Sequence, residues 1–567
     1  MVPVIVVFIY LLITAGIGFI AYQKSKNTSE DFFLASRTIG PMVFFLSLFA
    51  TNMTAVAILG SSGLAYRQGI GVYGLMASSS GFVIPMTIFF IGTRLWSLGK
   101  RMGHMTQVQF FRDRWECSGI GTVIFVLSAS MLVPYMIVSI MGGGRVLAGI
   151  STVLDEKGKP VMVEVVENGK PVMEPVMKDG KKVTDPEGKP VMAPKKVPQT
   201  RVPFAFGCAV VAVIVTLNVF FGGMRGTVWV NIFQTILFLS FGLVAVFVIS
   251  NGLEGGFSKI MEDMSAKKDT AALLSREKID PWYFWSYTFI PLSSIMFPHM
   301  SIMCLSARKV SAFKRTVVLY PLAIMAIWLP CVYLGVVAAQ VVPNVKESDG
   351  ILLLMLNQKA PVWVAGILGA GIISAVMGSD CHQVLALSTM FTRDVFTYYG
   401  GVEKYGEKGA VFFGRVFIVL VTTVAYLIAL VTPSNIFELA VRFAFSGFAA
   451  MSPIMLAALF WKRSTKYGAL ASTLFVGASV IATALLCQAE PGHVFYAMGG
   501  KQIMLNMRGD LMIFGMMPVV PMVIGSAICM GIASLLTAPP SSATLHKYFG
   551  PVTSSAAAPA AAHAVSV

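Results

Sequence analysis

Small and polar residues interrupt an apolar stretch that is long enough to cross a membrane. Residues 38–66 carry no charge, and a membrane-spanning helix needs about 20 mostly apolar residues. Residues 50–55 read ATNMTA and place three polar side chains near the middle of that stretch. Polar backbone without partners is costly at this depth. Two interpretations stay open, namely a close helix-packing face built on small residues and a discontinuous helix whose freed carbonyl groups bind a cation.

A second apolar stretch, residues 361–388, carries groups that could also bind a cation. At about 100° per residue, one helix face would carry Ala375, Gly378, Ser379 and His382. The Ser379 hydroxyl and the Ala375 carbonyl are oxygen ligands of the kind that hard cations prefer. Asp380 lies off this face, and either it is a functional intramembrane carboxylate or it faces water at the end of the span.

Three further polar sites fall within apolar spans. Asn231 can cap or pack its helix as well as bind, and His299 can make a structural hydrogen bond or act as a ligand. Glu438 and Arg442 are four residues apart, so they can pair on one helix face. Alternatively, Arg442 could bind a carboxylate of a solute through two hydrogen bonds.

The composition is that of a polytopic membrane protein. Of the 567 residues, 56% are hydrophobic and 12% are charged, against roughly 25% charged in soluble domains. The net charge of +16 comes from basic residues in short loops, so it does not indicate a nucleic-acid partner. The seven cysteines form no CxxC pair and predict neither a disulfide framework nor a zinc site. Because no hydrolase triad, phosphate-binding loop or metal-ligand cluster is found, we do not expect an enzyme.

Hydropathy predicts an all-α protein with about 13 transmembrane helices. The predicted spans are 3–21, 41–64, 73–97, 119–149, 202–222, 228–250, 282–304, 316–342, 361–388, 411–431, 436–460, 467–487 and 511–537. The first is read as a retained helix and not as a signal peptide. Loops after the odd-numbered spans are basic, which predicts a cytoplasmic-membrane protein with its N-terminus outside and its C-terminus inside.

Two runs of five spans predict an internal duplication. Spans 41–64 and 282–304 each open one run, and both are interrupted, the second by Pro291 and Pro298. Because five is odd, the second run would be inverted, and paired broken helices indicate a transporter site near the membrane midplane. The predicted organisation is an extra helix and loop (1–40), a transport core (41–460), two further helices (461–537) and a disordered tail (538–567).

Residues 151–200 form an unusual insert on the predicted outer side. The sequence GKPVM occurs there three times, at 158–162, 169–173 and 188–192. The pattern predicts short strands joined by turns. One interpretation is a loosely ordered β-meander or low-complexity insert without chemistry, and the other is a small lid or partner-binding module.

Several motifs together resemble the sodium:solute symporter family. They are DFFLASRTIG (31–40), SLFATNMTAVAILGSSG (47–63), GGMRGTVWVNIFQ (222–234), FPHMSIMCLSARK (297–309), QVLALSTMFTRDVF (383–396) and FAFSGFAAMSPIMLAALFWKRST (443–465). They follow the family order over nearly the whole chain except 151–200 and the tail. The resemblance implies a LeuT-like core of five plus five inverted helices.

The resemblance also implies a central sodium site. Carbonyl groups would come from Ala50, Met53 and Ala375, and hydroxyl groups from the positions of Gly378 and Ser379. Gly378 stands where the family usually has serine, so one ligand oxygen is missing.

Two further departures concern residues expected to couple the ion. Asn231 replaces an acidic residue implicated in the inner exit of the ion. The carboxylate of Asp380 is shifted by one position from the family pattern, and His382 follows it.

The same resemblance argues against a sugar as the solute. Val56, Ala57 and Phe297 occupy places where sugar transporters carry polar side chains. The predicted solute-binding residues are Asn52, Val56, Ala57, Phe297, His299 and Arg442. A small carboxylate or amino acid fits better, with Arg442 or the start of the second broken helix facing the carboxylate.

The sequence therefore predicts a sodium-coupled symporter that imports a small organic solute across the lipid bilayer by alternating access. No obligate protein partner is expected. The alternatives are a proton-coupled symporter that uses Asp380 and His382, a transporter-like solute sensor, and a uniporter or channel.

Overall fold

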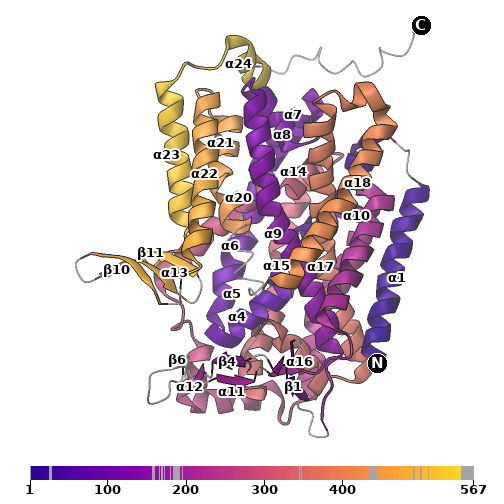
Figure 1. Cartoon of the computed structure of the whole chain (residues 1–567), viewed down its shortest axis with the longest axis vertical. Coiled ribbons are helices and arrows are strands. Elements are labelled where there is room, and N and C mark those ends of the chain that lie inside the picture. The colour runs from indigo at the N-terminus through magenta and orange to yellow at the C-terminus, as the bar shows by residue number, and fades with distance from the viewer. Residues whose placement is uncertain are drawn as a thin grey trace.

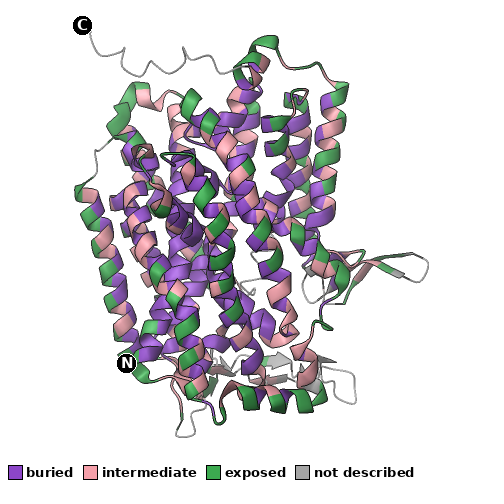
Figure 2. Ribbon diagram, turned by 180° about the vertical axis from the view of Figure 1, so that it is seen from behind, coloured by how far each residue is buried: buried purple, intermediate pink, exposed green. Residues whose placement is uncertain are grey.

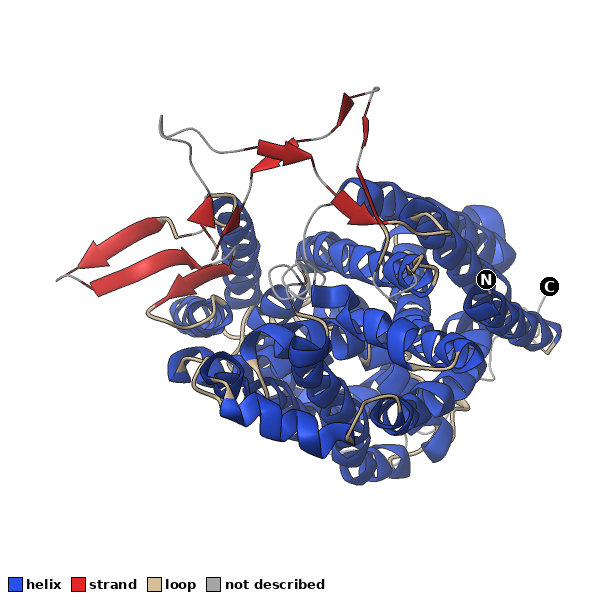
Figure 3. Ribbon diagram, turned by 90° about the horizontal axis from the view of Figure 1, so that it is seen from below, coloured by secondary structure: helices blue, strands red, loops and turns tan. Residues whose placement is uncertain are grey.

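The chain forms a bundle of helices, with its strands confined to two places (Figures 1 and 3). The computed structural model describes residues 2–24, 28–155, 160–164, 166–167, 170–171, 173–175, 177–178, 181–182, 192–194, 196–343, 345, 348–432, 444–489, 492–498, 501–507 and 510–550. All structural statements below concern these residues.

The helical segments, with η marking short 3₁₀ or π segments, divide into two groups around the insert. Before it lie α1 (Val2–Gln23), α2 (Ser29–Leu34), η1 (Ala35–Arg37), α3 (Pro41–Asn52), η2 (Val56–Gly60), α4 (Ser61–Gln68), α5 (Gly71–Tyr73), η3 (Gly74–Ser78), α6 (Ser79–Thr87), η4 (Ile88–Gly92), α7 (Thr93–Met102), α8 (Gln107–Arg114) and α9 (Ser118–Ile150). After it lie α10 (Phe204–Asn251), α11 (Gly256–Ala266), α12 (Lys268–Ala271), η5 (Ala272–Leu274), α13 (Pro281–Ser286), η6 (Tyr287–Ile295), α14 (Pro298–Leu305), α15 (Ser311–Val341), η7 (Ser348–Gly350), α16 (Ile351–Lys359), α17 (Val362–Met390), η8 (Phe391–Thr397), α18 (Gly401–Val431), α20 (Ser446–Ala450), α21 (Ser452–Phe460), α22 (Lys466–Leu486), α23 (Val519–Leu536) and α24 (Ser542–Phe549).

The described residues contain nine helices long and apolar enough to cross a membrane, or up to eleven when each bent pair counts as one span. The number is below 13 partly because α10 runs through two predicted spans. Gly223, with φ of +52°, breaks this helix, and a Cβ there would lie 2.7 Å from the Phe32 carbonyl oxygen. The predicted span 436–460 is described only from residue 444, so the exact count of 13 stays a prediction.

Both leading spans of the predicted repeats are broken, as the sequence predicts. The segments Pro41–Asn52 and Val56–Gln68 meet at 63°, and Pro281–Ile295 and Pro298–Leu305 meet at 50°. At the first break the Thr54 hydroxyl accepts a hydrogen bond from the Val56 N–H at 3.2 Å, an interaction that competes with helix. At the second, Pro298 begins α14, where a missing N–H costs nothing.

The strands of the insert form antiparallel pairs in a nested order and not a meander. Its strands are β1 (Met162–Glu164), β2 (Val166–Glu167), β3 (Lys170–Pro171), β4 (Met173–Pro175), β5 (Met177–Lys178), β6 (Lys181–Lys182), β7 (Met192–Pro194) and β8 (Lys196–Pro198). The first pairs with the last and β4 pairs with β7, while β2–β3 and β5–β6 are local hairpins. The prediction of short strands is confirmed, but their order along a meander is wrong because the two ends of the insert return to each other.

A second group of strands was not predicted. β9 (Val494–Met498), β10 (Lys501–Met507) and β11 (Asp510–Ile513) form an antiparallel sheet that extends to the side of the bundle (Figure 1). The last membrane helix therefore begins at Val519 and not at residue 511.

α17 forms the centre of the bundle, and the insert and α24 mark its two ends. Every residue from 368 to 390 is buried, and Figure 2 shows the buried interior. α1 begins at the end that carries the insert, whereas α24 lies at the opposite end (Figure 1).

Candidate cation and solute site

The first broken helix meets α17 at the residues that the sequence predicts. A Cβ on Gly378 would lie 3.4 Å from the Ala50 Cβ and 3.5 Å from the Ala50 carbonyl oxygen. Ala50, Met53, Ala375 and Ser379 are all buried. The break of the first helix and the face of α17 therefore bring backbone and hydroxyl oxygens into one neighbourhood.

Ser379 keeps lone pairs free for a further partner. Its hydroxyl lies 3.2 Å from the Val376 carbonyl oxygen, to which it can donate, and 3.5 Å from the Ser139 hydroxyl of α9. Ser139 was missed by the sequence reasoning, and the only available signal was a serine in the apolar run of α9. An oxygen-rich neighbourhood of this kind fits a hard monovalent cation, although Gly378 contributes no side-chain oxygen.

Asn231 links three helices at this place. Its Nδ2 donates to the Gly378 carbonyl oxygen at 3.2 Å and lies 2.9 Å from His382 Nδ1, both on α17. It also lies 3.4 Å from the Thr51 hydroxyl and from the Ser47 carbonyl oxygen of α3. Asn231 therefore joins α10 to both helices of the predicted cation site, which is more than a cap on its own helix.

Asp380 is fully buried, so the interpretation that it faces water is wrong. Both carboxylate oxygens, and Nε2 of His382, lack a hydrogen-bond partner within the described part of the chain. The central position of α17 explains the burial. Buried polar atoms without partners are costly, so this region suits a bound cation or ordered water.

A small cavity of about 50 Å³ adjoins the break of the first helix. Its described lining comes from the α3–η2 break, η3, α6, η6, α9, α15 and the residues just before α14 and α20. It comprises Asn52, Met53, Thr54, Val56, Ala57, Met76, Ser80, Ile84, Tyr135, Tyr287, Ile290, Pro291, Ser293, Ser294, Phe297, Trp328 and Phe445. None of these described residues is charged. Ligand pockets usually measure about 300–1,000 Å³, so the helices around this cavity must separate before a solute can enter.

The predicted solute residues are partly brought together here. Asn52, Val56, Ala57 and Phe297 line the cavity. His299 does not line it but packs behind, with its ring 5.0 Å from Phe297 and both nitrogens unpartnered among the described residues. Arg442 and its predicted partner Glu438 lie outside the described residues.

Other lining residues escaped the sequence reasoning. Tyr135 and Trp328 supply polar atoms from spans that otherwise look like ordinary apolar helices, and Tyr287 supplies one from the interrupted span 282–304. The available signal was a tyrosine or tryptophan inside such a span, which packing explains equally well.

The chain is similar in sequence to a known family over most of its length. A sequence profile described as the sodium:solute symporter family matches residues 32–153 and 201–477. The chain is 21% identical over 493 residues to a sodium/pantothenate symporter of Haemophilus influenzae, covering 84% of this chain and 89% of that protein. It is 24% identical over 495 residues to a sodium/proline symporter of Staphylococcus aureus, covering 84% of each.

Solved structures share the fold. A sodium-coupled sialic acid symporter, in a substrate-bound outward-open state, has a TM-score of 0.68 at 15% identity, covering 95% of this chain and 99% of that one. A nucleobase-cation-symport-1 family transporter in a closed conformation has a TM-score of 0.51 at 11% identity, covering 91% and 97%.

Proposed function

The chain belongs to the sodium:solute symporter family, and we propose that it couples sodium entry to the uptake of a small carboxylate or amino acid. The observation that carries this proposal is the contact between the break after Ala50 and the α17 face at Gly378 and Ser379. The named relatives transport pantothenate and proline with sodium, and both solutes carry a carboxylate.

Sodium would bind between α3 and α17, with oxygens from Ala50, Met53, Ala375 and Ser379. Binding there stabilises the arrangement in which the solute cavity is formed, so sodium raises the affinity for solute. By linkage the solute raises the affinity for sodium by the same factor. One charge that crosses 100 mV supplies about 2.3 kcal/mol, enough for accumulation of the solute severalfold.

Asn231, Asp380 and His382 would tune this coupling. Asn231 holds α3 and α17 together through its amide, so it can transmit a change in one helix to the other. Because Gly378 supplies no hydroxyl, Ser379 carries the side-chain contribution to the sodium site alone.

The solute would bind in the cavity beside Asn52, Val56, Ala57 and Phe297, with His299 behind it and Arg442 as the predicted partner of a carboxylate. The uncharged described lining disfavours multiply charged solutes. The α14 N-terminus at Pro298 offers a positive dipole end as a second partner for the carboxylate.

We place the protein in the cytoplasmic membrane with its N-terminus outside and its C-terminus inside. Opposite positions for the start of α1 and for α24 support an odd number of crossings. In this arrangement residues 41–460 form the transport core, and the insert at 151–200 lies outside.

The experiment is uptake of radiolabelled L-proline and L-lactate by proteoliposomes, with and without an inward sodium gradient. Ser379→Ala should raise the sodium concentration for half-maximal uptake by about tenfold, since one of few ligand oxygens is lost. Ser388→Ala is the matched control, because that buried α17 hydroxyl donates to the Gly414 carbonyl oxygen at 2.8 Å, away from the site.

Four results would contradict the proposal. An unchanged sodium requirement in Ser379→Ala would contradict the assignment of Ser379 to the sodium site. Uptake driven by a pH gradient without sodium would instead support proton coupling, and flux that ignores every ion gradient would indicate a uniporter. Binding without any uptake would indicate a sensor.

A further inference from the structure

Trp328 stands out among the residues that line the cavity. It is the one residue of the described lining whose side chain has a buried polar atom without a hydrogen-bond partner, the indole Nε1. The residue as a whole is only 5% exposed. Buried tryptophan N–H groups usually find an acceptor, and leaving one without a partner costs free energy.

Three of the neighbouring polar groups already have hydrogen-bond partners. The Asn52 amide donates to the Tyr320 hydroxyl at 2.5 Å, and the Ser294 hydroxyl lies 2.8 Å from that of Thr87. The Thr54 hydroxyl accepts a hydrogen bond from the Val56 N–H at 3.2 Å. These groups can exchange partners when a solute enters, whereas the Trp328 donor has no partner to give up.

Trp328 belongs to α15, which the sequence reasoning left out of the solute site. The cavity joins it to the break of the first helix, because Asn52, Val56 and Ala57 line the same space. An N–H can donate only one hydrogen bond and cannot accept. The group that satisfies it must therefore be an acceptor, and the carboxyl oxygens of the proposed solutes are acceptors of this kind.

We propose that Trp328 donates its indole N–H to a carboxyl oxygen of the transported solute and thereby selects monocarboxylates and amino acids. This inference rests on the proposed function and names the residue that sets its solute class. A site built around a buried hydrogen-bond donor rejects analogues that lack the acceptor, because binding them leaves the donor unpaired.

The test measures sodium-driven uptake of L-proline and L-lactate by Trp328→Phe in proteoliposomes. Phenylalanine keeps an aromatic ring and removes the N–H, so KM should rise about tenfold, while the sodium concentration for half-maximal uptake at saturating solute stays unchanged. Pyrrolidine and ethanol, which lack the carboxyl group, should compete with neither acid in the wild type. Trp363→Phe is the matched control, since Trp363 is 61% exposed at the start of α17.

A second substitution guards against a packing defect in the phenylalanine variant. Incorporation of 3-benzothienylalanine at position 328 keeps the bicyclic shape and lacks the N–H, so it should raise KM as Trp328→Phe does. Wild-type KM in both variants would overturn this inference and leave the proposed symport intact. Failure of the wild type to take up either acid with sodium would overturn both.

Discussion

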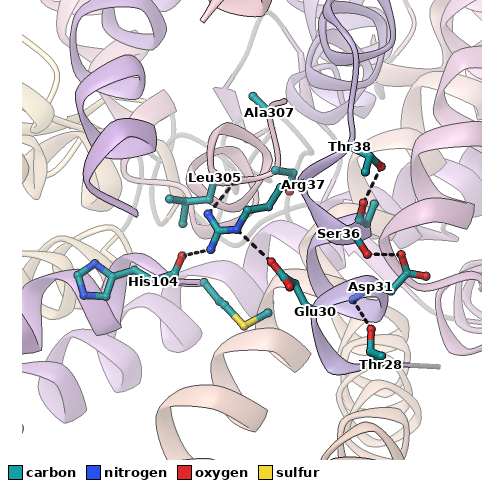
Figure 4. A network of polar contacts seen from close by, with 12 residues as sticks. Thr28, Glu30, Asp31, Ser36, Arg37, Thr38, His104, Leu305 and Ala307 are labelled. Carbon is teal, nitrogen blue, oxygen red and sulfur yellow. Dashed lines mark hydrogen bonds and ion pairs between the residues drawn. The ribbon is translucent and has the colours of Figure 1, made fainter. Parts of the chain in front are cut away.

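The middle of the bundle and the end that carries α24 differ in the contacts that particular polar groups make. In the middle, the Asp380 carboxylate, the His299 ring and the Trp328 indole N–H have no hydrogen-bond partner within the described residues. At the α24 end, Arg37 donates to the carbonyl oxygens of His104 at 2.9 Å and Leu305 at 3.3 Å (Figure 4). The three groups in the middle can still form hydrogen bonds with a bound ion, water or solute, whereas the hydrogen bonds of Arg37 hold segments of the chain together.

The α24 end also contains a strained turn that these bonds hold in place. Ala35, Ser36 and Arg37 all have positive φ, between 49° and 53°. A left-handed conformation costs roughly 1–2 kcal/mol per residue for side chains other than glycine. Such a turn persists only because its surroundings fix it, here through Arg37 and through the Arg308 N–H, which donates to the Ile39 carbonyl oxygen at 3.0 Å. This end is therefore suited to hold one conformation until the contacts of Arg37 are released.

The largest effect is expected where the two central helices touch. Gly378→Leu would place a branched side chain where a Cβ already lies 3.3 Å from Gln234 Oε1 and 3.4 Å from the Ala50 Cβ. The cation site should be forced apart, and sodium-driven uptake should fall by up to about a hundredfold, because overpacking costs about 1–3 kcal/mol and displaces ligands. Gly16→Leu is the control, since a Cβ at Gly16 meets nothing within 4 Å. Substantial uptake by the Gly378→Leu protein would mean that the ion binds elsewhere.

A smaller effect is expected at the α24 end from loss of Arg37. Arg37→Ala removes the bonds to His104 and Leu305, so the end should open more often, and labelling of buried Cys304 on α14 by a thiol reagent should rise about tenfold. The assay uses a variant in which Cys304 is the remaining cysteine. Glu30→Ala is the matched control, because its carboxylate is 55% exposed and surface ion pairs contribute little. An equal rise in both variants would show that the ion pair, and not the carbonyl contacts, closes this end, and no rise in either would show that neither does.

The sequence predicts the structure of the middle of the bundle only where a residue is unusual for an apolar span. Polar residues at 51–54 and Pro298 interrupt apolar spans, and both breaks were predicted from local chemistry. The contact of Ala50 with Gly378 was available only through family resemblance, because it joins residues more than 300 positions apart.

The remaining features of the fold and the site cannot be predicted from the local sequence. Trp328 and Tyr135 occur in apolar spans, where an aromatic residue facing a cavity cannot be told from one packed in the core. The break of α10 at Gly223 depends on the approach of Phe32, and the turn at 35–37 depends on Arg37 reaching another helix. These are properties of the assembled bundle.

A substitution at the same position that raises the affinity for sodium would test the cation site in the opposite way to Gly378→Leu. Gly378→Ser restores the hydroxyl that the family usually has, and the new hydroxyl could donate to Gln234 Oε1, which has no partner among the described residues. Its lone pairs would then serve the cation, and the sodium concentration for half-maximal uptake should fall about threefold. Gly371→Ser on the same helix, beside Phe241, is the control. A higher sodium requirement in Gly378→Ser would indicate that close packing matters more at this position than the missing oxygen.

The smallest effect concerns the attachment of α24. Asp113 accepts hydrogen bonds from Lys547 at 2.6 Å and from the Tyr548 hydroxyl at 2.5 Å, and it lies 3.2 Å from His104 Nε2. The hydrogen bond from His104, followed by those from Lys547 and Tyr548, lowers the pKa of Asp113 below its ordinary value. A lowered carboxyl pKa stabilises the folded state fully above the ordinary value of about 3.9, and this stabilisation is lost as the pH falls through the folded value.

Hydrogen exchange of residues 542–549, corrected for the intrinsic rate, should therefore be constant between pH 5 and 8. Asp113→Asn removes the charge at every pH and should speed this exchange only about threefold. The effect is small because Glu116 still accepts a hydrogen bond from the Thr544 hydroxyl. Faster exchange of α24 in the wild type within that pH range would show that another titrating group controls its docking. The α24 end would then respond to pH and would no longer contrast with the middle as the fixed part of the molecule.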